Sequence, residues 1–221
     1  MPTVAAIYTA LNIVDPIKAL FAELLPDARL INIADDSLIQ EVIAAGGVTP
    51  AVTRRLVAYY QAAAQAGADL IFNTCSSVGE VALLGQQFVD VPIVQIDHAM
   101  AGAAVQQGAA IGVLATLPTT LGPTVRLVQR KAAEAGRDVA VHEGLAAGAF
   151  QALLAGQAAE HDRRIMAAAE VLADQVELFV LAQASMGRLQ DVLAAATGKP
   201  VLTSPRLGVL SVARRLEELA L

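Results

Sequence analysis

The stretch Ala68-Asp-Leu-Ile-Phe-Asn-Thr-Cys-Ser-Ser-Val-Gly79 decides the fold, because it occurs a second time in similar form. The second copy is Val176-Glu-Leu-Phe-Val-Leu-Ala-Gln-Ala-Ser-Met-Gly187, again an apolar strand followed by small polar residues and a glycine. Cys75, the only cysteine, corresponds to Gln183, which stands 108 residues later. Residues 6–11 and 113–118 form a further pair with nearly the same spacing. The chain is therefore expected to form two similar halves that face one cleft.

The composition indicates an α/β protein. Hydrophobic residues make up 56% of the 221 residues and aromatic residues only 4%, which suits parallel strands covered by helices on both faces. Short apolar runs predict strands near residues 4–8, 28–33, 68–72, 92–96, 110–115, 138–142, 177–181 and 200–203. The predicted fold is two pseudosymmetric Rossmann-like lobes, each with a mainly parallel sheet of about four strands and flanking helices, and with the active site between them.

The repeat also predicts where the lobes begin and end. Lobe one is expected to span residues 1–97 and lobe two residues 98–205. The last helix, residues 206–221, follows the final strand, so we expect it to pack back on lobe one. Lobe one is then discontinuous in sequence.

Charge and hydropathy exclude several classes of partner. The net charge is −6 and the Lys and Arg residues are scattered, which argues against nucleic acid or a membrane surface as a partner. The uncharged run 99–125 contains glycines and prolines and predicts helix, strand and loop rather than a membrane span. A start without a basic region, together with a single thiol, predicts a cytoplasmic location. Exposed alanine-rich helices predict a homo-oligomer.

Cys75 is the strongest candidate for chemistry. It follows a strand and precedes a helix predicted from about Val78, and exposed backbone N–H groups at such a position are expected to lower the pKa of the thiol. Ser76, Ser77 and the neighbouring N–H groups are expected to cradle a carboxylate or a developing enolate oxygen. A lone cysteine is often a small buried hydrophobe. A surrounding of Asn73, Thr74 and two serines favours the functional interpretation.

Other polar residues are expected to gather at the carboxyl ends of the strands, where open parallel sheets bind ligands. The candidate substrate-binding residues are Thr9, Asn73, Thr74, Ser76, Ser77, Asp97, Thr116, Thr119, Thr120, Ala184 and Ser185. The run from Thr116 to Thr120 is a second anion-site candidate, although helix capping with Pro118 in the first turn also accounts for it. Asp97 is an N-cap, an orienting carboxylate or a base, and Arg206 is a candidate clamp for a carboxylate.

No cofactor or metal is implied by the sequence. His142 and His161 lack partners at metal-ligand spacing, and one cysteine cannot build a thiolate zinc site. Neither a Gly-x-Gly-x-x-Gly motif after the first strand nor a Walker-type phosphate loop is present, which makes nucleotide cofactors unexpected.

Three segments carry a resemblance to a known family, namely Asn73-Thr-Cys75-Ser-Ser, Ile111-Gly-Val-Leu-Ala-Thr116 and Leu181-Ala-Gln-Ala-Ser-Met186. With these segments the chain resembles, over nearly its whole length, the aspartate/glutamate racemase superfamily, which includes hydantoin racemases, maleate isomerases and arylmalonate decarboxylases. The resemblance implies two α/β lobes and no cofactor. It also implies a pair of cysteines, one on each lobe, that exchange a proton across the substrate carbon.

Carried over by position, the first cysteine of the family falls on Cys75 and the second on Gln183, while Ser76 and residues 116–120 match contacts to the substrate carboxylate. Glutamine is neither an acid nor a base near neutral pH, so this chain departs from two-thiol racemisation. The arylmalonate decarboxylases also have one cysteine, but in the second half. The maleate isomerases use the first-half cysteine as nucleophile and retain the second.

The sequence thus predicts a cofactor-independent isomerase or racemase acting on a small carboxylate or carbonyl compound. The Cys75 thiolate is expected to act as nucleophile or proton carrier, and Gln183 to donate a hydrogen bond across the cleft. A single-cysteine lyase or decarboxylase is an alternative. A non-catalytic small-molecule binding protein on the same fold is another.

Overall fold

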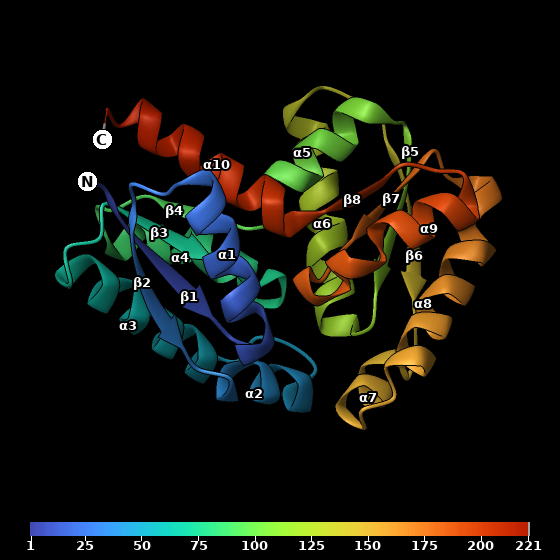
Figure 1. The fold of residues 1–221 in the computed structure, drawn as a ribbon, viewed down its shortest axis with the longest axis horizontal. Coiled ribbons are helices and arrows are strands. Elements are labelled where there is room, and N and C mark those ends of the chain that lie inside the picture. Colours follow the sequence, from blue (N-terminus) through green and yellow to red (C-terminus); the bar gives the residue numbers. More distant parts are fainter. Residues whose placement is uncertain (221) are drawn as a thin grey trace. The chain divides into compact units, whose positions relative to one another are not determined.

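A computed structural model describes residues 1–220 of the chain, which divides into two compact units (Figure 1). Unit 1 comprises Met1–His98 together with the segment from Pro205 onward, and unit 2 comprises Ala99–Ser204. Each unit is a parallel sheet between helices. The predicted α/β fold of two such lobes is confirmed.

The sheet of unit 1 has the strand order β2-β1-β3-β4, and all its strand pairs are parallel. Its strands are β1 (Thr3–Tyr8), β2 (Arg29–Ala34), β3 (Leu70–Asn73) and β4 (Ile93–Gln95). The two central strands, β1 and β3, are buried along their whole length, whereas the edge strand β2 is half exposed. Burial on both faces explains why the central strands are continuous apolar runs without alternation.

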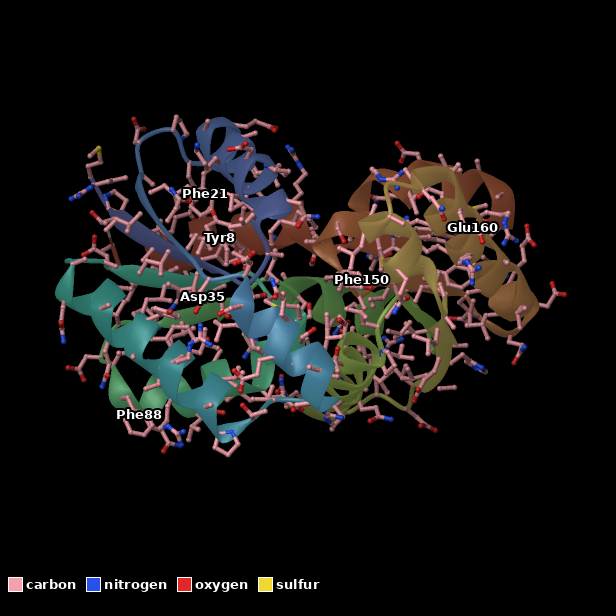
Figure 2. All side chains as sticks on the ribbon, turned by 90° about the horizontal axis from the view of Figure 1, so that it is seen from below. Tyr8, Phe21, Asp35, Phe88, Phe150 and Glu160 are labelled. Atoms are coloured by element: carbon pink, nitrogen blue, oxygen red, sulfur yellow. The ribbon has the colours of Figure 1, made fainter. Side chains whose placement is uncertain are left out.

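Helices cover both faces of this sheet. They are α1 (Val14–Leu24), α2 (Ser37–Ala45), α3 (Pro50–Gln65), α4 (Gly79–Gly85) and α10 (Ser204–Glu218). The apolar core on one face joins Ala5, Ile7 and Ile71 to α2, α3 and α4. On the opposite face the ring of Phe21 from α1, labelled in Figure 2, lies 5.9 Å from the ring of Phe72 in β3.

Helix α10 completes unit 1 from a distant part of the sequence. It is drawn in red in Figure 1 and buries Val209, Val212 and Leu216. Gly208 permits the close approach, because a Cβ at this position would lie 2.7 Å from the Ile96 carbonyl oxygen. A side chain there would have to displace backbone.

Unit 2 repeats the plan with the strand order β6-β5-β7-β8, again entirely parallel. Its strands are β5 (Ala110–Ala115), β6 (Ala140–Leu145), β7 (Leu178–Leu181) and β8 (Val201–Thr203). Its helices are α5 (His98–Gln107), α6 (Pro118–Glu134), α7 (Ala149–Leu154), α8 (Ala158–Leu172) and α9 (Gln190–Thr197). One core joins α7, α8 and α9 to Leu114, Phe179 and Leu181 of the sheet. The equal strand order of the two units agrees with the repeat in the sequence.

Local sequence signals account for several helix ends. Helix α3 begins after Thr49, whose hydroxyl accepts a hydrogen bond from the Val52 N–H at 3.1 Å, with Pro50 in the first turn. Helices α2 and α9 end at Gly46 and Gly198, both in the left-handed conformation that glycine adopts without strain. Each predicted strand is present, with ends displaced by up to a few residues.

The run 99–125 forms α5, β5 and the start of α6, as predicted. Among residues 1–220, no helix combines the length and the apolar character that crossing a membrane requires.

Candidate active site

Cys75 lies in unit 1 directly beyond the carboxyl end of β3. The chain is extended at Cys75 and then forms a single 3-10 turn, Ser76–Val78, before α4 begins at Gly79. The sulfur is partly buried and packs against the apolar core of the unit. The predicted helix after Cys75 is therefore present, but it opens through a 3-10 turn.

Three polar groups act on the sulfur of Cys75. The Thr9 hydroxyl, from the end of β1, and the backbone N–H groups of Ser77 and Val78 each favour its charged form and lower the pKa of the thiol. The Val78 N–H itself donates to the Cys75 carbonyl oxygen at 3.4 Å. The parallel pairing of β1 and β3 brings Thr9 next to Cys75, since Ile7 stands opposite Asn73 in the register. The arrangement suits a sulfur that carries negative charge during part of a reaction.

The expectation that the pKa of Cys75 is lowered is wrong for the free protein. Burial raises the pKa of the Cys75 thiol above its ordinary value, and the negative charge of Asp97 adds to the rise. The hydrogen bonds from Thr9, Ser77 and Val78 lower the pKa, but the net direction is upward. The resting group at neutral pH is thus the protonated thiol.

A buried tyrosine that the sequence reasoning missed supports this segment. The Tyr60 hydroxyl of α3 donates to Asn73 Oδ1 at 3.1 Å, and Asn73 Nδ2 donates to the Cys75 carbonyl oxygen at 3.1 Å. Burial raises the pKa of Tyr60, so its hydroxyl stays a donor. The helical periodicity of α3 places Tyr60 on the buried face, but a buried aromatic residue at that spacing is typical of an ordinary core.

The remaining candidates in unit 1 have distinct roles in the structure. Thr74 Oγ1 donates to the Ile7 carbonyl oxygen at 2.8 Å, which ties the segment to β1. Ser76, Ser77 and Asp97 are buried, with 7%, 5% and 3% of their surfaces exposed. Asp97 follows β4, which pairs with β3 and so ends beside the Cys75 segment, and the negative charge of Asp97 raises the pKa of Cys75. The structure therefore brings the unit 1 candidates together around Cys75.

Gln183 occupies the corresponding position in unit 2, beyond the carboxyl end of β7. Its Oε1 accepts two hydrogen bonds from Thr116, one from the backbone N–H at 2.7 Å and one from the hydroxyl at 2.9 Å. A backbone N–H can only donate, so the atom that faces it must be the amide oxygen. The two N–H donors on Nε2 are left available for another acceptor.

Both donors of Thr116, the first residue of the second anion-site candidate, are therefore committed to Gln183. Side-chain capping does not account for the segment either, since the N-cap of α6 is Leu117 and makes no such bond. Thr120 is buried, and Thr119 Oγ1 is buried and has no hydrogen-bond partner within residues 1–220. Of this run, Thr119 retains an unused hydroxyl.

Ala184 and Ser185 lie in the 3-10 segment Ala184–Leu189, which follows Gln183 and is partly buried at both residues. An ion pair anchors the far end of this segment, because Arg188 Nη1 donates to Asp162 Oδ2 of α8 at 2.6 Å. Asp162 also bonds the buried ring of His161, whose Nδ1 lies 2.7 Å from Oδ1. Hydrogen bonding from Arg188 lowers the pKa of Asp162.

Arg206, the candidate clamp for a carboxylate, is paired with a carboxylate of the protein itself. Its Nη1 forms an exposed ion pair with Glu23 Oε1 at 2.8 Å, from α10 to α1 within unit 1. Across residues 1–220 no three or more His, Cys, Asp or Glu side chains gather as a metal site would require. A separate charged cluster at the start of α8, around Glu160 in Figure 2, joins that residue to Arg163 and Arg164.

Comparison with known proteins identifies the family. The family model described as Asp/Glu/Hydantoin racemase matches residues 7–212, nearly the whole chain. The protein belongs to the Asp/Glu/hydantoin racemase family. No curated protein matches the chain.

Solved structures of other family members share the fold. Glutamate racemase RacE1 from Bacillus anthracis is 13% identical with a TM-score of 0.78, over 98% of this chain and 82% of that one. A putative Asp/Glu racemase from Yersinia pestis is 18% identical with a TM-score of 0.75, over 97% and 99% of the two chains. Allantoin racemase from Pseudomonas fluorescens is 18% identical with a TM-score of 0.65, over 99% and 92%. At such identities the likeness speaks for the fold alone.

Proposed function

We propose that this racemase-family protein is a cofactor-independent enzyme that moves a proton at a carbon next to a carboxylate or carbonyl group, with Cys75 as its single thiol acid/base. The observation that carries the proposal is the position of Cys75 at the end of β3, where the pairing with β1 brings Thr9 beside it and where Thr9, Ser77 and Val78 favour the charged form of the sulfur. Such donors stabilise the thiolate that proton transfer to carbon leaves behind. Family members named as glutamate and allantoin racemases act on compounds of this chemical class.

Proton removal at such a carbon begins with the Cys75 thiolate. The C–H bond breaks, its electron pair becomes part of an enolate, and the proton goes to sulfur. When the thiol returns a proton to the same face of the enolate, the starting configuration is restored. Gln183 cannot supply a proton to the opposite face, because an amide does not ionise near neutral pH. We assign Gln183 Nε2 the role of a hydrogen-bond donor to the substrate.

The raised pKa of Cys75 favours a second candidate, a decarboxylating lyase. A resting thiol is ready to donate a proton rather than to accept one. In this reaction the bond to the carboxyl carbon breaks, carbon dioxide leaves, and its electron pair remains on an enolate. The Cys75 proton then goes to carbon, and water reprotonates the thiolate. One thiol suffices for this sequence of steps.

Incubation in deuterium oxide with single enantiomers of glutamate, aspartate, allantoin and a 5-substituted hydantoin, and with an achiral α-aryl malonate, tests the proposal. We expect deuterium at the reacting carbon with retained configuration if Cys75 is the only acid/base, with inverted configuration if a second acid/base makes the protein a racemase, or in the product together with carbon dioxide if it is a lyase. The Cys75→Ser variant is the control and should lose the activity. Undiminished exchange in that variant would refute the role of Cys75.

A further inference from the structure

We propose that Tyr60 is a positioning residue for Cys75, which it holds through Asn73 so that the sulfur meets its backbone N–H donors. The inference rests on the proposed function of Cys75 and extends it to a residue that has no contact with solvent. Tyr60 lies on α3, separated in sequence from the Cys75 segment by the end of α3 and by strand β3.

The contacts form a short chain from the helix to the reactive residue. Tyr60 donates to Asn73 Oδ1, and Asn73 Nδ2 donates to the carbonyl oxygen of Cys75. Both ends of the Asn73 amide are thereby used, and its orientation is fixed. Fixing the Cys75 carbonyl group fixes the peptide plane from which the 3-10 turn Ser76–Val78 departs. That turn carries the Ser77 and Val78 N–H groups that favour the charged form of the sulfur.

Helix α4 leaves room for this arrangement. A Cβ at Gly85, the last residue of α4, would lie 2.5 Å from Cδ2 of the Tyr60 ring. Because Gly85 has no side chain, the Tyr60 ring can pack against α4 while its hydroxyl bonds Asn73. Tyr60 and Gly85 therefore form a matched pair.

In unit 2 the positions that correspond to Tyr60, Asn73 and Gly85 hold apolar residues. Asn73 stands opposite Ile7 in the register of unit 1, and Leu181 stands opposite Leu114, the equivalent position of β5, in unit 2. The spacing of 108 residues that relates Asn73 to Leu181 also relates Gly85 to Leu193. On the buried face of α8, Ala169 takes the place that Tyr60 has on the buried face of α3. Leu181, Ala169 and Leu193 all lie in the apolar core of unit 2.

This difference between the two units separates the residues that the fold requires from those that the Cys75 segment requires. The same strand order and helix packing are reached in unit 2 with leucine and alanine, so the fold does not require a buried tyrosine and asparagine. A buried hydrogen-bonded pair adds little net stability over a well-packed apolar pair. The polar pair occurs in the unit whose strand end carries a thiol, and the apolar set occurs where glutamine replaces it.

The test compares Tyr60→Phe and the double variant Tyr60→Phe/Asn73→Leu with wild type. Tyr59→Phe is the matched control, because Tyr59 is the neighbouring residue of α3 and its hydroxyl bonds Asp35 instead. The measured quantities are the rate of Cys75 alkylation by iodoacetamide against pH, the melting temperature, and turnover on a substrate found by deuterium exchange. Alkylation needs no substrate and reports on the single thiol directly.

We expect alkylation at pH 7 to slow by roughly threefold in Tyr60→Phe and roughly tenfold in the double variant, because lost N–H donors raise the pKa of the thiol. The pH at half-maximal rate should rise in the same order, and kcat should fall more than KM changes. Tyr59→Phe should keep the wild-type profile. Wild-type profiles in both Tyr60 variants, or failure of the double variant to fold, would overturn the inference. If the Cys75→Ser variant turned over the substrate as fast as the wild type, the proposed function would be refuted. The alkylation result does not depend on turnover and would still stand.

Discussion

The Thr116 hydroxyl lies 2.9 Å from Gln183 Oε1, and Thr9 takes the equivalent place in unit 1, where its hydroxyl lowers the pKa of the Cys75 thiol. Each threonine follows the first strand of its sheet, and each acceptor follows the third strand in sequence. Unit 2 thus retains the donors that would serve an acceptor sulfur. The acceptor atom differs, because an amide oxygen stands where unit 1 has a sulfur.

Replacement of Gln183 by cysteine should therefore give the protein a second acid/base. For a substrate that exchanges deuterium with retention, we expect Gln183→Cys to raise the rate of inversion by tenfold or more, on the scale of general acid–base effects of roughly 10²–10⁴. Chiral chromatography combined with mass spectrometry measures inversion and exchange together. Gln183→Ser is the control, because its hydroxyl can accept from Thr116 but does not ionise near neutral pH. Equal inversion in both variants would contradict the prediction.

The pH dependence of Cys75 alkylation follows from the direction of its pKa shift. Because burial raises the pKa of the thiol, the reaction with iodoacetamide at pH 7 should be slower than that of a free thiol and should still increase above pH ~8.5. The folded state then binds the thiol proton more tightly than the unfolded state. This contribution to stability is present below pH ~8.5 and is lost as the pH rises through the folded value.

The Thr9 hydroxyl opposes this upward shift, so Thr9→Val should raise the pKa of Cys75 further and slow its alkylation. Thr116→Val removes the same group from unit 2 and is the matched control. A rate measured between pH 6 and pH 10 separates the two variants. An unchanged profile in Thr9→Val would show that the hydroxyl does not act on the sulfur.

A substitution at Gly208 should destabilise unit 1. The Cβ of Gly208→Ala would lie 2.7 Å from the Ile96 carbonyl oxygen, so α10 must shift, at a cost of about 1–3 kcal/mol in the free energy of unfolding. Gly102 of α5 has no heavy atom within 4 Å of such a Cβ. Gly102→Ala should therefore stabilise the protein by about 0.5–1 kcal/mol. Urea denaturation of the two variants gives opposite signs if the prediction holds.

The Arg188–Asp162 ion pair should contribute to stability in a pH-dependent way. Arg188 lowers the pKa of Asp162, so the contribution is present above the unfolded pKa of ~3.9 and is lost as the pH falls through the lower folded value. We expect Arg188→Ala to cost less than about 1 kcal/mol at pH 7 and nothing at low pH. Arg206→Ala, which breaks the more exposed pair with Glu23, should cost almost nothing. Equal losses in thermal denaturation would contradict this.

Much of the fold was predictable from the sequence because the duplication and the strands have direct signatures. The central strands β1 and β3 are buried on both faces and are therefore unbroken apolar runs. The repeat around Cys75 and Gln183 indicated that the second half follows the plan of the first. Glycines and prolines in the run 99–125 indicated correctly that it is not one long helix.

Within the candidate site, the hydrogen bonds and the pKa shift of the candidate residues could not be predicted from the sequence. The direction of the Cys75 pKa shift depends on a balance between burial and three hydrogen bonds, and the extent of burial is a property of the folded chain. The two hydrogen bonds from Thr116 to Gln183 could not be predicted, because the orientation of the Gln183 amide is a tertiary feature. Tyr60 was missed because a tyrosine on the buried face of a helix has the same pattern whether its hydroxyl supports a site or not.

Helix α10 gives the protein a particular order of assembly during synthesis. Unit 2 lies within one continuous segment, whereas unit 1 needs α10, which the ribosome makes only after β8. The segment around Cys75 therefore emerges early, but the sheet that holds it lacks one covering helix until translation has passed residue 218. The nascent chain can complete the glutamine-bearing half before the thiol-bearing half is closed.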